Sequence, residues 1–151
     1  MARGFKVAKG FEDKGINLPV RKTKLSAGYD IEAAEDIVVP AFKPGTAPTL
    51  IPTGIKAYME DDEVLYLYNR SSNPKKKGLV LANSVGVIDA DYYENPDNDG
   101  HIMFAFFNFK DEDVEIKKGD AIGQGVFMKY LLTDDDAAEG ERLGGFGSTS
   151  K

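Results

Sequence analysis

Two carboxylates stand two positions apart in the segment Gly86–Tyr92, which reads Gly-Val-Ile-Asp-Ala-Asp-Tyr. In an extended chain the side chains at i and i+2 point to the same face, so Asp89 and Asp91 are expected to share one side of a strand. Two like charges on one face repel each other unless something compensates them. A strand that runs into a polar turn accounts for the same residues, so the segment alone leaves both interpretations open.

Positive charge suited to phosphate oxygens is scarce in this chain. The 151 residues carry a net charge of −6 and include only four arginines, but a small phosphate ligand requires only local positive charge. The planar guanidinium of Arg70 or Arg142 offers a fork of donors that matches phosphate oxygens. The run Lys75-Lys76-Lys77 could also form a phosphate platform, and a solvated turn after Pro74 explains the same run.

The last residues combine glycines, hydroxyl groups and one aromatic ring. Gly144–Thr149 reads Gly-Gly-Phe-Gly-Ser-Thr, and the absence of a following Gly-Lys-Ser/Thr excludes a Walker-type loop. Glycine N–H groups together with the hydroxyls of Ser148 and Thr149 can still wrap phosphates, and Phe146 can stack on a base. A disordered terminus with a single Phe is the alternative explanation.

The overall composition indicates one folded domain and excludes several classes of site. A hydrophobic fraction of 42% is enough for a core in a chain of this length. The chain has no Cys and one His, which excludes disulfides, thiol catalysis and multi-His metal sites, and His101 is expected to be a structural residue beside a turn. The acidic charge argues against nucleic-acid binding. The lack of a long apolar run predicts no membrane segment and a cytoplasmic location, the host cytoplasm if the protein is phage-encoded.

The hydrophobic pattern is that of short β-strands separated by turn residues such as Pro44-Gly45. Strands are expected over residues 29–33, 37–39, 55–58, 64–68, 102–107, 114–116 and 121–128. Only Ser71–Lys77 suggests a helix, provided that Pro74 lies in its first turn. The pattern predicts an all-β barrel or sandwich in one domain, 1–151, with a β core over about residues 1–132 and a flexible C-terminal arm over about 133–151.

One expected strand is apolar on both faces. Phe104 and Phe106 share one face, whereas Phe107 and Phe109 share the other. Such a strand is either central in a sandwich or buried against another subunit, and the sequence leaves these two possibilities open.

Five motifs occur in the order that is typical of the dUTPase family. They are Gly28-Tyr29-Asp30, Arg70-Ser71-Ser72, Gly86–Tyr92, Gly119-Asp120 with Gln124, and Arg142 with Gly144–Thr149. The chain therefore resembles the trimeric dUTPases, in a bacterial or phage-like form, from about Ala27 to Thr149. The resemblance implies a distorted jelly roll, a homotrimer with shared active sites, and Mg²⁺-dependent hydrolysis of dUTP to dUMP and pyrophosphate. That reaction limits uracil incorporation into DNA and supplies dUMP for dTMP synthesis.

The resemblance also implies roles around the base and sugar of the nucleotide. Asp89 corresponds to the general base that deprotonates a water attacking the α-phosphorus, and Asp91 to a structural residue. Tyr92 corresponds to the ring that packs on deoxyribose and leaves no room for a 2′-hydroxyl. Asn83, with the backbone of Val87 and Ile88, corresponds to the hairpin that reads uracil by hydrogen bonds.

Further roles implied by the resemblance concern the triphosphate. The residues expected to contact phosphates are Arg70, Ser71, Ser72, Gln124 and Arg142. Asp30 is expected to hold Mg²⁺ through a bound water. Phe146 is expected to stack on uracil in an arm that closes over the nucleotide, and the same arm contains Gly147, Ser148 and Thr149.

Two positions depart from the commonest family pattern. Arg142 stands four residues before Phe146, where five is usual, and the loop of residues 93–100 is longer than the common form, so no role is assigned to Met103. Two alternative functions stay open. One is a dCTP deaminase of the same superfamily, which shares an Arg-Ser-Ser element. The other is a regulatory protein that binds a protein partner, for which the loop of residues 93–100 is the candidate surface.

Overall fold

The computed structural model describes residues 2–145, and nearly all of their regular structure is β. The strands are β1 (Gly4–Val7), β2 (Tyr29–Glu32), β3 (Ile37–Val39), β4 (Thr49–Pro52), β5 (Ile55–Tyr58), β6 (Glu63–Asn69), β7 (Leu79–Leu81), β8 (Gly86–Asp89), β9 (Met103–Asn108), β10 (Val114–Ile116) and β11 (Ala121–Lys129). One short helix, α1 (Asn73–Lys77), and one 3₁₀ turn, η1 (Ala90–Tyr92), complete the described part. The expected all-β fold class is confirmed.

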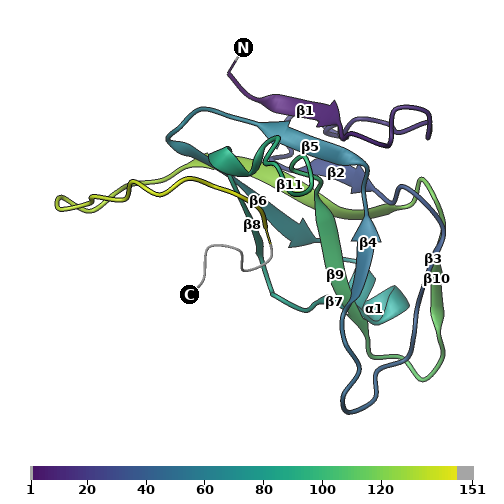
Figure 1. Cartoon of the computed structure of the whole chain (residues 1–151). Helices are drawn as coiled ribbons and strands as arrows, with labels where there is room; N and C mark the ends of the chain where they lie inside the picture. Colours follow the sequence, from purple (N-terminus) through teal and green to yellow (C-terminus); the bar gives the residue numbers. More distant parts are fainter. Residues whose placement is uncertain (1, 146–151) are drawn as a thin grey trace.

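The strands form two larger antiparallel sheets and two strand pairs (Figure 1). The four-stranded sheet has the order β2-β11-β6-β8, and the three-stranded sheet has the order β4-β9-β7. Strand β1 pairs with β5, and β3 pairs with β10. Leu65 and Ile122 from the four-stranded sheet meet Phe104, Phe106 and Ile51 from the three-stranded sheet in one continuous core.

The expected strands are confirmed to within about one residue at each end, whereas β1, β4 and β7 were not predicted. Strand β4 ends at Pro52, a residue that is typical of turns, and β7 has only three residues beside α1. The helix is confirmed, with Pro74 in its first turn and Gly78 in the left-handed conformation (φ 67°) at its end. A Cβ on Gly78 would lie 2.9 Å from the backbone N of Lys110, so glycine is needed there for space as well as conformation.

The expectation that Asp89 and Asp91 share one face of a strand is wrong. Strand β8 ends at Asp89, and Asp91 lies in the 3₁₀ turn that follows. Asp89 stands opposite Val64, one residue from the start of β6, and the chain turns immediately after this last pair. The two carboxylates are nevertheless brought to one place, by the turn rather than by the alternation of a strand.

The aromatic strand β9 is apolar on both faces, but only one face is covered within the chain. Phe104 and Phe106 are fully buried in the core. Phe107 is only partly buried, and Phe109, just beyond the strand, is 57% exposed. Strand β9 is central in its sheet, between β4 and β7, yet the outer face of that sheet remains open. The strand is therefore central in its sheet, as one of the two possibilities had it, whereas burial of its second face against another subunit stays a prediction.

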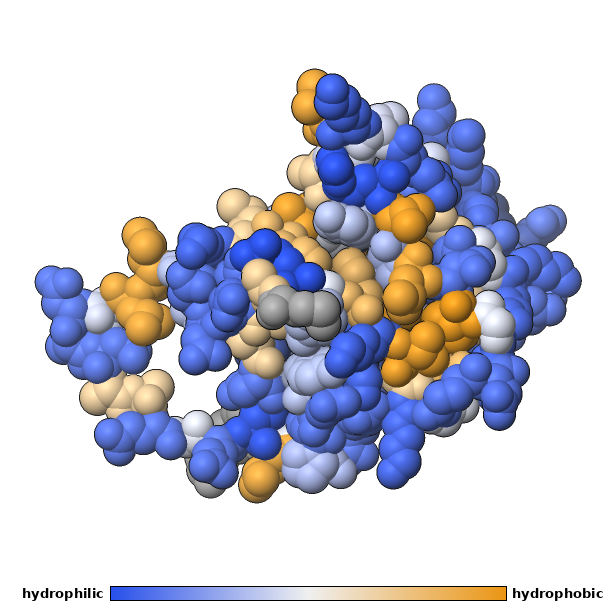
Figure 2. Space-filling model, turned by 90° about the horizontal axis from the view of Figure 1, so that it is seen from above, coloured by the Kyte–Doolittle hydropathy of each residue, from blue (hydrophilic) through white to orange (hydrophobic). Residues whose placement is uncertain are grey.

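After β11 the chain leaves the body of the protein as an arm, defined here as residues 130–145, which contains no helix or strand. The arm projects to one side and then returns toward the sheets (Figure 1). Figure 2 shows this projection at the left, with hydrophobic side chains on an otherwise hydrophilic surface. Leu131 is 95% exposed on it. Among the described residues, no helix has the length and apolar character that crossing a bilayer requires.

Candidate active site

A pocket opens between the two large sheets where the connection from β7 to β8 separates them. Strand β7 pairs with β9, whereas β8 pairs with β6, so two strands that are close in sequence belong to different sheets. Strand β8 is the last strand of its sheet, and within residues 2–145 no strand lies beside the edge that faces away from β6. Alternate backbone N–H and C=O groups on that edge are therefore free to bind a ligand.

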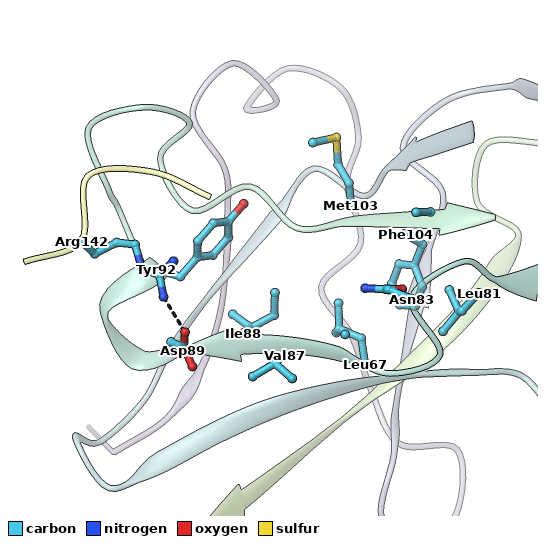
Figure 3. A pocket seen from close by; sticks show the side chains of 12 residues that line it. Leu67, Leu81, Asn83, Val87, Ile88, Asp89, Tyr92, Met103, Phe104 and Arg142 are labelled. Atoms are coloured by element: carbon cyan, nitrogen blue, oxygen red, sulfur yellow. Dashed lines mark hydrogen bonds and ion pairs between the residues drawn. The ribbon is translucent and has the colours of Figure 1, made fainter. Parts of the chain in front are cut away.

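The pocket contains an apolar floor and two polar ends (Figure 3). Its lining residues are Leu67, Leu81, Asn83, Gly86, Val87, Ile88, Asp89, Tyr92, Met103, Phe104, Ala105 and Arg142. Asn83 lies in the β7–β8 connection at one end, and Asp89 lies with Arg142 at the other. Ile88 points toward the pocket, whereas Val87 points away from it and is 56% exposed. A flat, partly apolar ligand with a charged end matches this arrangement.

The charged end is formed by two carboxylates and one guanidinium. Arg142 Nε donates to Asp91 Oδ1 at 3.1 Å, and Arg142 Nη2 donates to Asp89 Oδ2. Burial by itself lowers the pKa of Arg142, but the bond to Asp91 and the charges of both carboxylates outweigh it and raise that pKa. Arg142 is therefore the group that compensates the two like charges noted in the sequence, and it fastens the arm to the end of β8.

Tyr92 forms one wall of the pocket beside this charged end. Its side chain is 7% exposed, and its hydroxyl donates to the carbonyl oxygen of His101 at 2.6 Å. Burial raises the pKa of the Tyr92 hydroxyl, so the group stays neutral near pH 7. The imidazole of His101 accepts a hydrogen bond from the backbone N–H of Gly54 at 2.9 Å, and burial lowers its pKa. His101 is thus a structural residue beside a turn.

A second cluster of predicted site residues lies where β6 ends and α1 begins. We call it the Arg70 cluster, and its members are Asp30, Arg70, Ser71, Ser72 and Gln124. Asp30 on β2 and Tyr68 on β6 both stand opposite Gln124 on β11. Gln124 Nε2 donates to the carbonyl oxygen of Asn69 at 3.4 Å. Arg70 is exposed and reaches the carbonyl oxygen of Ala121 at 3.3 Å, so its remaining guanidinium donors can face a ligand.

Gly28 is required for the position of the Gln124 side chain. A Cβ at Gly28 would lie 2.0 Å from Gln124 Oε1, a distance at which the amide would have to move. The glycine of the first motif therefore lets the side chain of the fourth motif lie flat across β2. This contact links two sequence motifs that are separated by almost one hundred positions.

Within one chain the Arg70 cluster and the charged end of the pocket are far apart. Asp89 stands opposite Val64, whereas Arg70 follows the other end of β6. Six residues of extended strand span about 20 Å. Asp30 lies three strands away from β8, in the order β8-β6-β11-β2, which adds about 14 Å across the sheet. One chain therefore presents two separate groups of predicted site residues, which we call half-sites.

The residues present fit a divalent cation only as an outer-sphere site. Among residues 2–145, no group of three or more His, Cys, Asp or Glu side chains is placed to hold a metal ion. Mg²⁺ commonly keeps several waters and binds through one or two carboxylates plus ligand phosphates. A single carboxylate, Asp30, beside the donors of Arg70 and Gln124 is consistent with that kind of site.

The structure thus brings part of the predicted site together and separates the rest. The pocket contains Asp89, Tyr92, Asn83, Val87, Ile88 and Arg142, whereas Asp30, Arg70, Ser71, Ser72 and Gln124 lie outside it, on or next to the neighbouring strands β2, β11 and β6. Phe146, Gly147, Ser148 and Thr149 lie outside the described residues. Sequence analysis missed Leu67, Leu81, Met103, Phe104 and Ala105, which line the pocket. The alternation along β9 could have assigned Met103 and Ala105 to the face opposite Phe104, but not to a pocket.

Comparisons with known proteins place the chain in one family. The family model of dUTPases matches residues 14–150. A deoxyuridine 5′-triphosphate nucleotidohydrolase of Lactococcus lactis is 59% identical over 149 residues, which is 97% of each chain. The crystal structure of a dUTPase from Streptococcus mutans has a TM-score of 0.80 and 51% identity, covering 87% of this chain and 98% of that one.

A more distant likeness concerns a mutant dUTPase from phage phi11 of S. aureus, whose structure details the coordination of a structural Mg(II) ion. It has a TM-score of 0.69 and 20% identity, covering 93% of this chain and 98% of that one. At this identity the likeness supports the fold alone.

Proposed function

Because the chain belongs to the dUTPase family and is a dUTP diphosphatase, we propose that its pocket binds the deoxyuridine of dUTP and that a water molecule attacks the α-phosphorus. The products are dUMP and pyrophosphate. The observation that carries this proposal is the free edge of β8, which runs from Asn83 and Gly86 to Asp89 between an apolar floor and Arg142. Backbone groups at one end of this edge can hydrogen-bond to a base, while the carboxylate of Asp89 at the other end can accept a proton.

Uracil is the base that fits the Asn83 end of the pocket. The imide edge of uracil alternates acceptor, donor and acceptor, and it can pair with backbone groups on the free edge of β8 and with the amide of Asn83. Cytosine reverses two of these groups and would leave buried donors or acceptors unpaired, which costs about 1–3 kcal/mol for each group. A thymine methyl would have to enter the narrow connection between β7 and β8. The Tyr92 ring forms the wall against which the sugar packs.

Asp89 is the proposed general base. Its side chain is 52% exposed, so water can reach it, and its Oδ2 is held by Arg142. Among the described residues, no hydrogen bond reaches Asp89 Oδ1, which leaves that oxygen to accept a proton from the attacking water. In this scheme the phosphates of dUTP compete with Asp89 and Asp91 for the guanidinium of Arg142. When dUTP binds, Arg142 releases the two carboxylates and donates to phosphate oxygens instead.

A complete site requires the Arg70 cluster of a neighbouring subunit, and we therefore propose a homotrimer with shared sites. The outer face of the three-stranded sheet supports it, because Phe42, Phe107 and Phe109 form an exposed aromatic group with ring centroids 5.0–6.1 Å apart. Phe107 lies on the same face of β9 as Met103 and Ala105, which line the pocket. The apolar face is thus continuous with the pocket, and a second copy that covers this face would lie against the site.

Mg²⁺ is the cofactor that this site is proposed to use. A triphosphate carries about four negative charges, more than Arg70 and Arg142 can neutralise. The ion would supply that neutralisation, and Asp30 would hold one of its waters, beside Arg70 and Gln124. Ser71 and Ser72 would donate hydroxyl hydrogen bonds to phosphate oxygens. The tail residues Phe146–Thr149 are proposed to close over the bound nucleotide.

A nucleotide panel tests the proposed function. The full chain is incubated with dUTP, dCTP, dTTP or UTP, with Mg²⁺ or with EDTA, and pyrophosphate and ammonia are measured. We expect pyrophosphate from dUTP, with the other three substrates poorer by at least about 10²-fold in kcat/KM, and little turnover in EDTA. Ammonia from dCTP would instead indicate a deaminase. No turnover of any nucleotide would refute the proposal.

A further inference from the structure

The hydroxyl of Tyr92 makes two hydrogen bonds to other parts of the protein. It donates to the carbonyl oxygen of His101 at 2.6 Å and accepts from the amide Nδ2 of Asn98 at 2.8 Å. Both bonds lie at the far end of the ring from the backbone of Tyr92. The residue therefore offers the pocket only its ring, and the position of that ring depends on groups outside the pocket.

The direction of the bond between Asn98 and Tyr92 is set by the other contacts of Asn98. The Oδ1 atom of Asn98 accepts from Asn95 Nδ2 at 2.8 Å and from the backbone N–H of Gly100 at 3.0 Å. Because these two partners are donors, the oxygen of the amide must face them and the NH₂ group must face Tyr92. The hydroxyl is then an acceptor toward Asn98, and its own proton is left for the carbonyl of His101.

The loop that contains Asn98 is held rigidly in place. Asn95 donates to the carbonyl oxygen of Tyr92 at 2.8 Å, and its Oδ1 accepts from the backbone N–H of Asn98 at 3.1 Å. Lys56 on β5, 9% exposed, donates to Glu94 at 2.5 Å and to Asp99 at 2.8 Å. Glu94 and Asp99 both have positive φ, 52° and 62°, a conformation that costs non-glycine residues energy and that these contacts hold.

We propose that Asn98 is a positioning residue that fixes the ring of Tyr92 and thereby sets the discrimination between deoxyribose and ribose. The inference rests on the proposed function, in which the sugar packs on Tyr92. Exclusion of a 2′-hydroxyl by collision works only if the wall does not move, since a ring that swings by a fraction of an ångström admits the extra oxygen. Asn98 and the carbonyl of His101 hold the ring at its hydroxyl, and the covalent bond to the β-carbon of Tyr92 holds its opposite end.

The test compares the sugar selectivity of Asn98→Ala, Tyr92→Phe and the double variant. The quantity measured is kcat/KM for UTP divided by kcat/KM for dUTP, with Mg²⁺ present. Each single variant keeps an aromatic ring but loses the bond between the amide and the hydroxyl. We expect each to raise the ratio by about fivefold or more, the equivalent of one ordinary hydrogen bond. The double variant should raise it no further than the larger single effect, because the same contact is lost.

The matched control is Pro96→Ala, which changes an exposed residue of the same loop whose side chain has no group that can hydrogen-bond to the Tyr92 hydroxyl. It should leave the ratio within about twofold of wild type, and thermal unfolding of all variants is recorded beside the kinetics. A ratio that stays at the wild-type value in Asn98→Ala, or effects that simply add in the double variant, would overturn the inference. If the wild type hydrolyses dUTP but the variants keep the wild-type ratio of kcat/KM for UTP to that for dUTP, only the role of Asn98 is refuted. A wild-type protein without dUTP turnover refutes the proposed function and the inference with it.

Discussion

Arg142 binds Asp89, and this ion pair joins the last described part of the arm to the end of the strand that carries the proposed base. Arg142 is 15% exposed, whereas Asp89 is 52% exposed, so the guanidinium is the buried partner. Asp91 holds the same guanidinium from the turn that follows. The arm is therefore seated on the charged end of the pocket, where the phosphates of dUTP would compete with both carboxylates for Arg142 in the proposed scheme.

Arg142→Gln is expected to lower kcat/KM for dUTP by about 10–100-fold, because a charge-assisted contact to the phosphates is lost. Steady-state kinetics measure this effect. The control is Lys129→Ala, which removes an exposed ion pair to Asp62 (2.9 Å) outside the pocket and should change kcat/KM by less than about twofold. Equal effects of the two substitutions would contradict a phosphate-binding role for Arg142.

Asp89→Asn should reduce kcat by about 10²-fold or more while nucleotide binding is retained, because proton acceptance alone is removed. Asp91→Asn is the matched control, since it removes a second carboxylate bound to the same arginine. It should act mainly on KM and leave kcat within about tenfold. Binding of a non-hydrolysable dUTP analogue, measured by calorimetry, separates the two effects. Near-wild-type turnover in Asp89→Asn would exclude Asp89 as the base.

Mixing two inactive variants tests whether the half-sites come from different subunits. Asp89→Asn and Arg70→Ala chains are unfolded together, refolded at equal concentrations and assayed with dUTP. If each site uses Asp89 of one chain and Arg70 of another, random assembly restores both residues in about one quarter of the sites. Activity that does not rise above that of the separate variants would indicate that both residues act within one chain. Light scattering of the wild type provides the mass of the assembly.

Lys56→Met should destabilise the protein by about 1–3 kcal/mol, because it leaves the carboxylates of Glu94 and Asp99 without their cation. The lower part of this range allows for Glu94, which is half exposed and screened by water. Denaturant unfolding measures the loss. A control at an exposed ion pair, Lys117→Met, should change the free energy of unfolding much less than Lys56→Met does. A smaller loss for Lys56→Met than for the control would contradict the anchoring role of Lys56.

Acid should reduce the contribution of Asp99, in the loop of residues 93–100, to the free energy of unfolding. Burial raises the pKa of Asp99, but hydrogen bonds from Lys56 and from the backbone of Lys9 outweigh it and hold that pKa below its usual value. The stabilisation by Asp99 is therefore complete above about pH 4 and is lost as the pH falls through the lowered folded-state pKa. The difference in unfolding free energy between wild type and Asp99→Asn should be constant from about pH 5 to 8 and should shrink below about pH 4. A difference that widens with acid would contradict this sign.

The pKa of Lys56 changes in the opposite direction to that of Asp99. Burial lowers it, yet the bonds to Asp99 and Glu94 raise it above its usual value. Its contribution to stability is present at neutral pH and is lost only as the pH rises through that raised pKa. Deprotonation of Lys56 would therefore not explain a fall in the free energy of unfolding of the wild type below pH 8.

Most of the strands and the short helix were accessible from the sequence, whereas β1, β4 and β7 were not. Alternation of apolar side chains is a local property, and it predicted β6, β9 and β11 without any knowledge of their partners. The motif residues Asp89, Arg70 and Tyr92 were recognised because their types and spacing resemble those of a known family. The error at Asp91 arose because nothing in the local pattern indicates where the pairing of β8 with β6 ends.

Tertiary structure alone decided how these residues are grouped. The pocket exists because β7 and β8 pair with different strands, and such long-range pairing leaves no signal in the spacing of side chains. For the same reason Met103 enters the pocket, Asn98 reaches the hydroxyl of Tyr92, and Arg70 lies at the opposite end of β6 from Asp89. A sequence specifies which side chains are available, but distances between residues far apart in the chain follow only from the way in which the sheets pack.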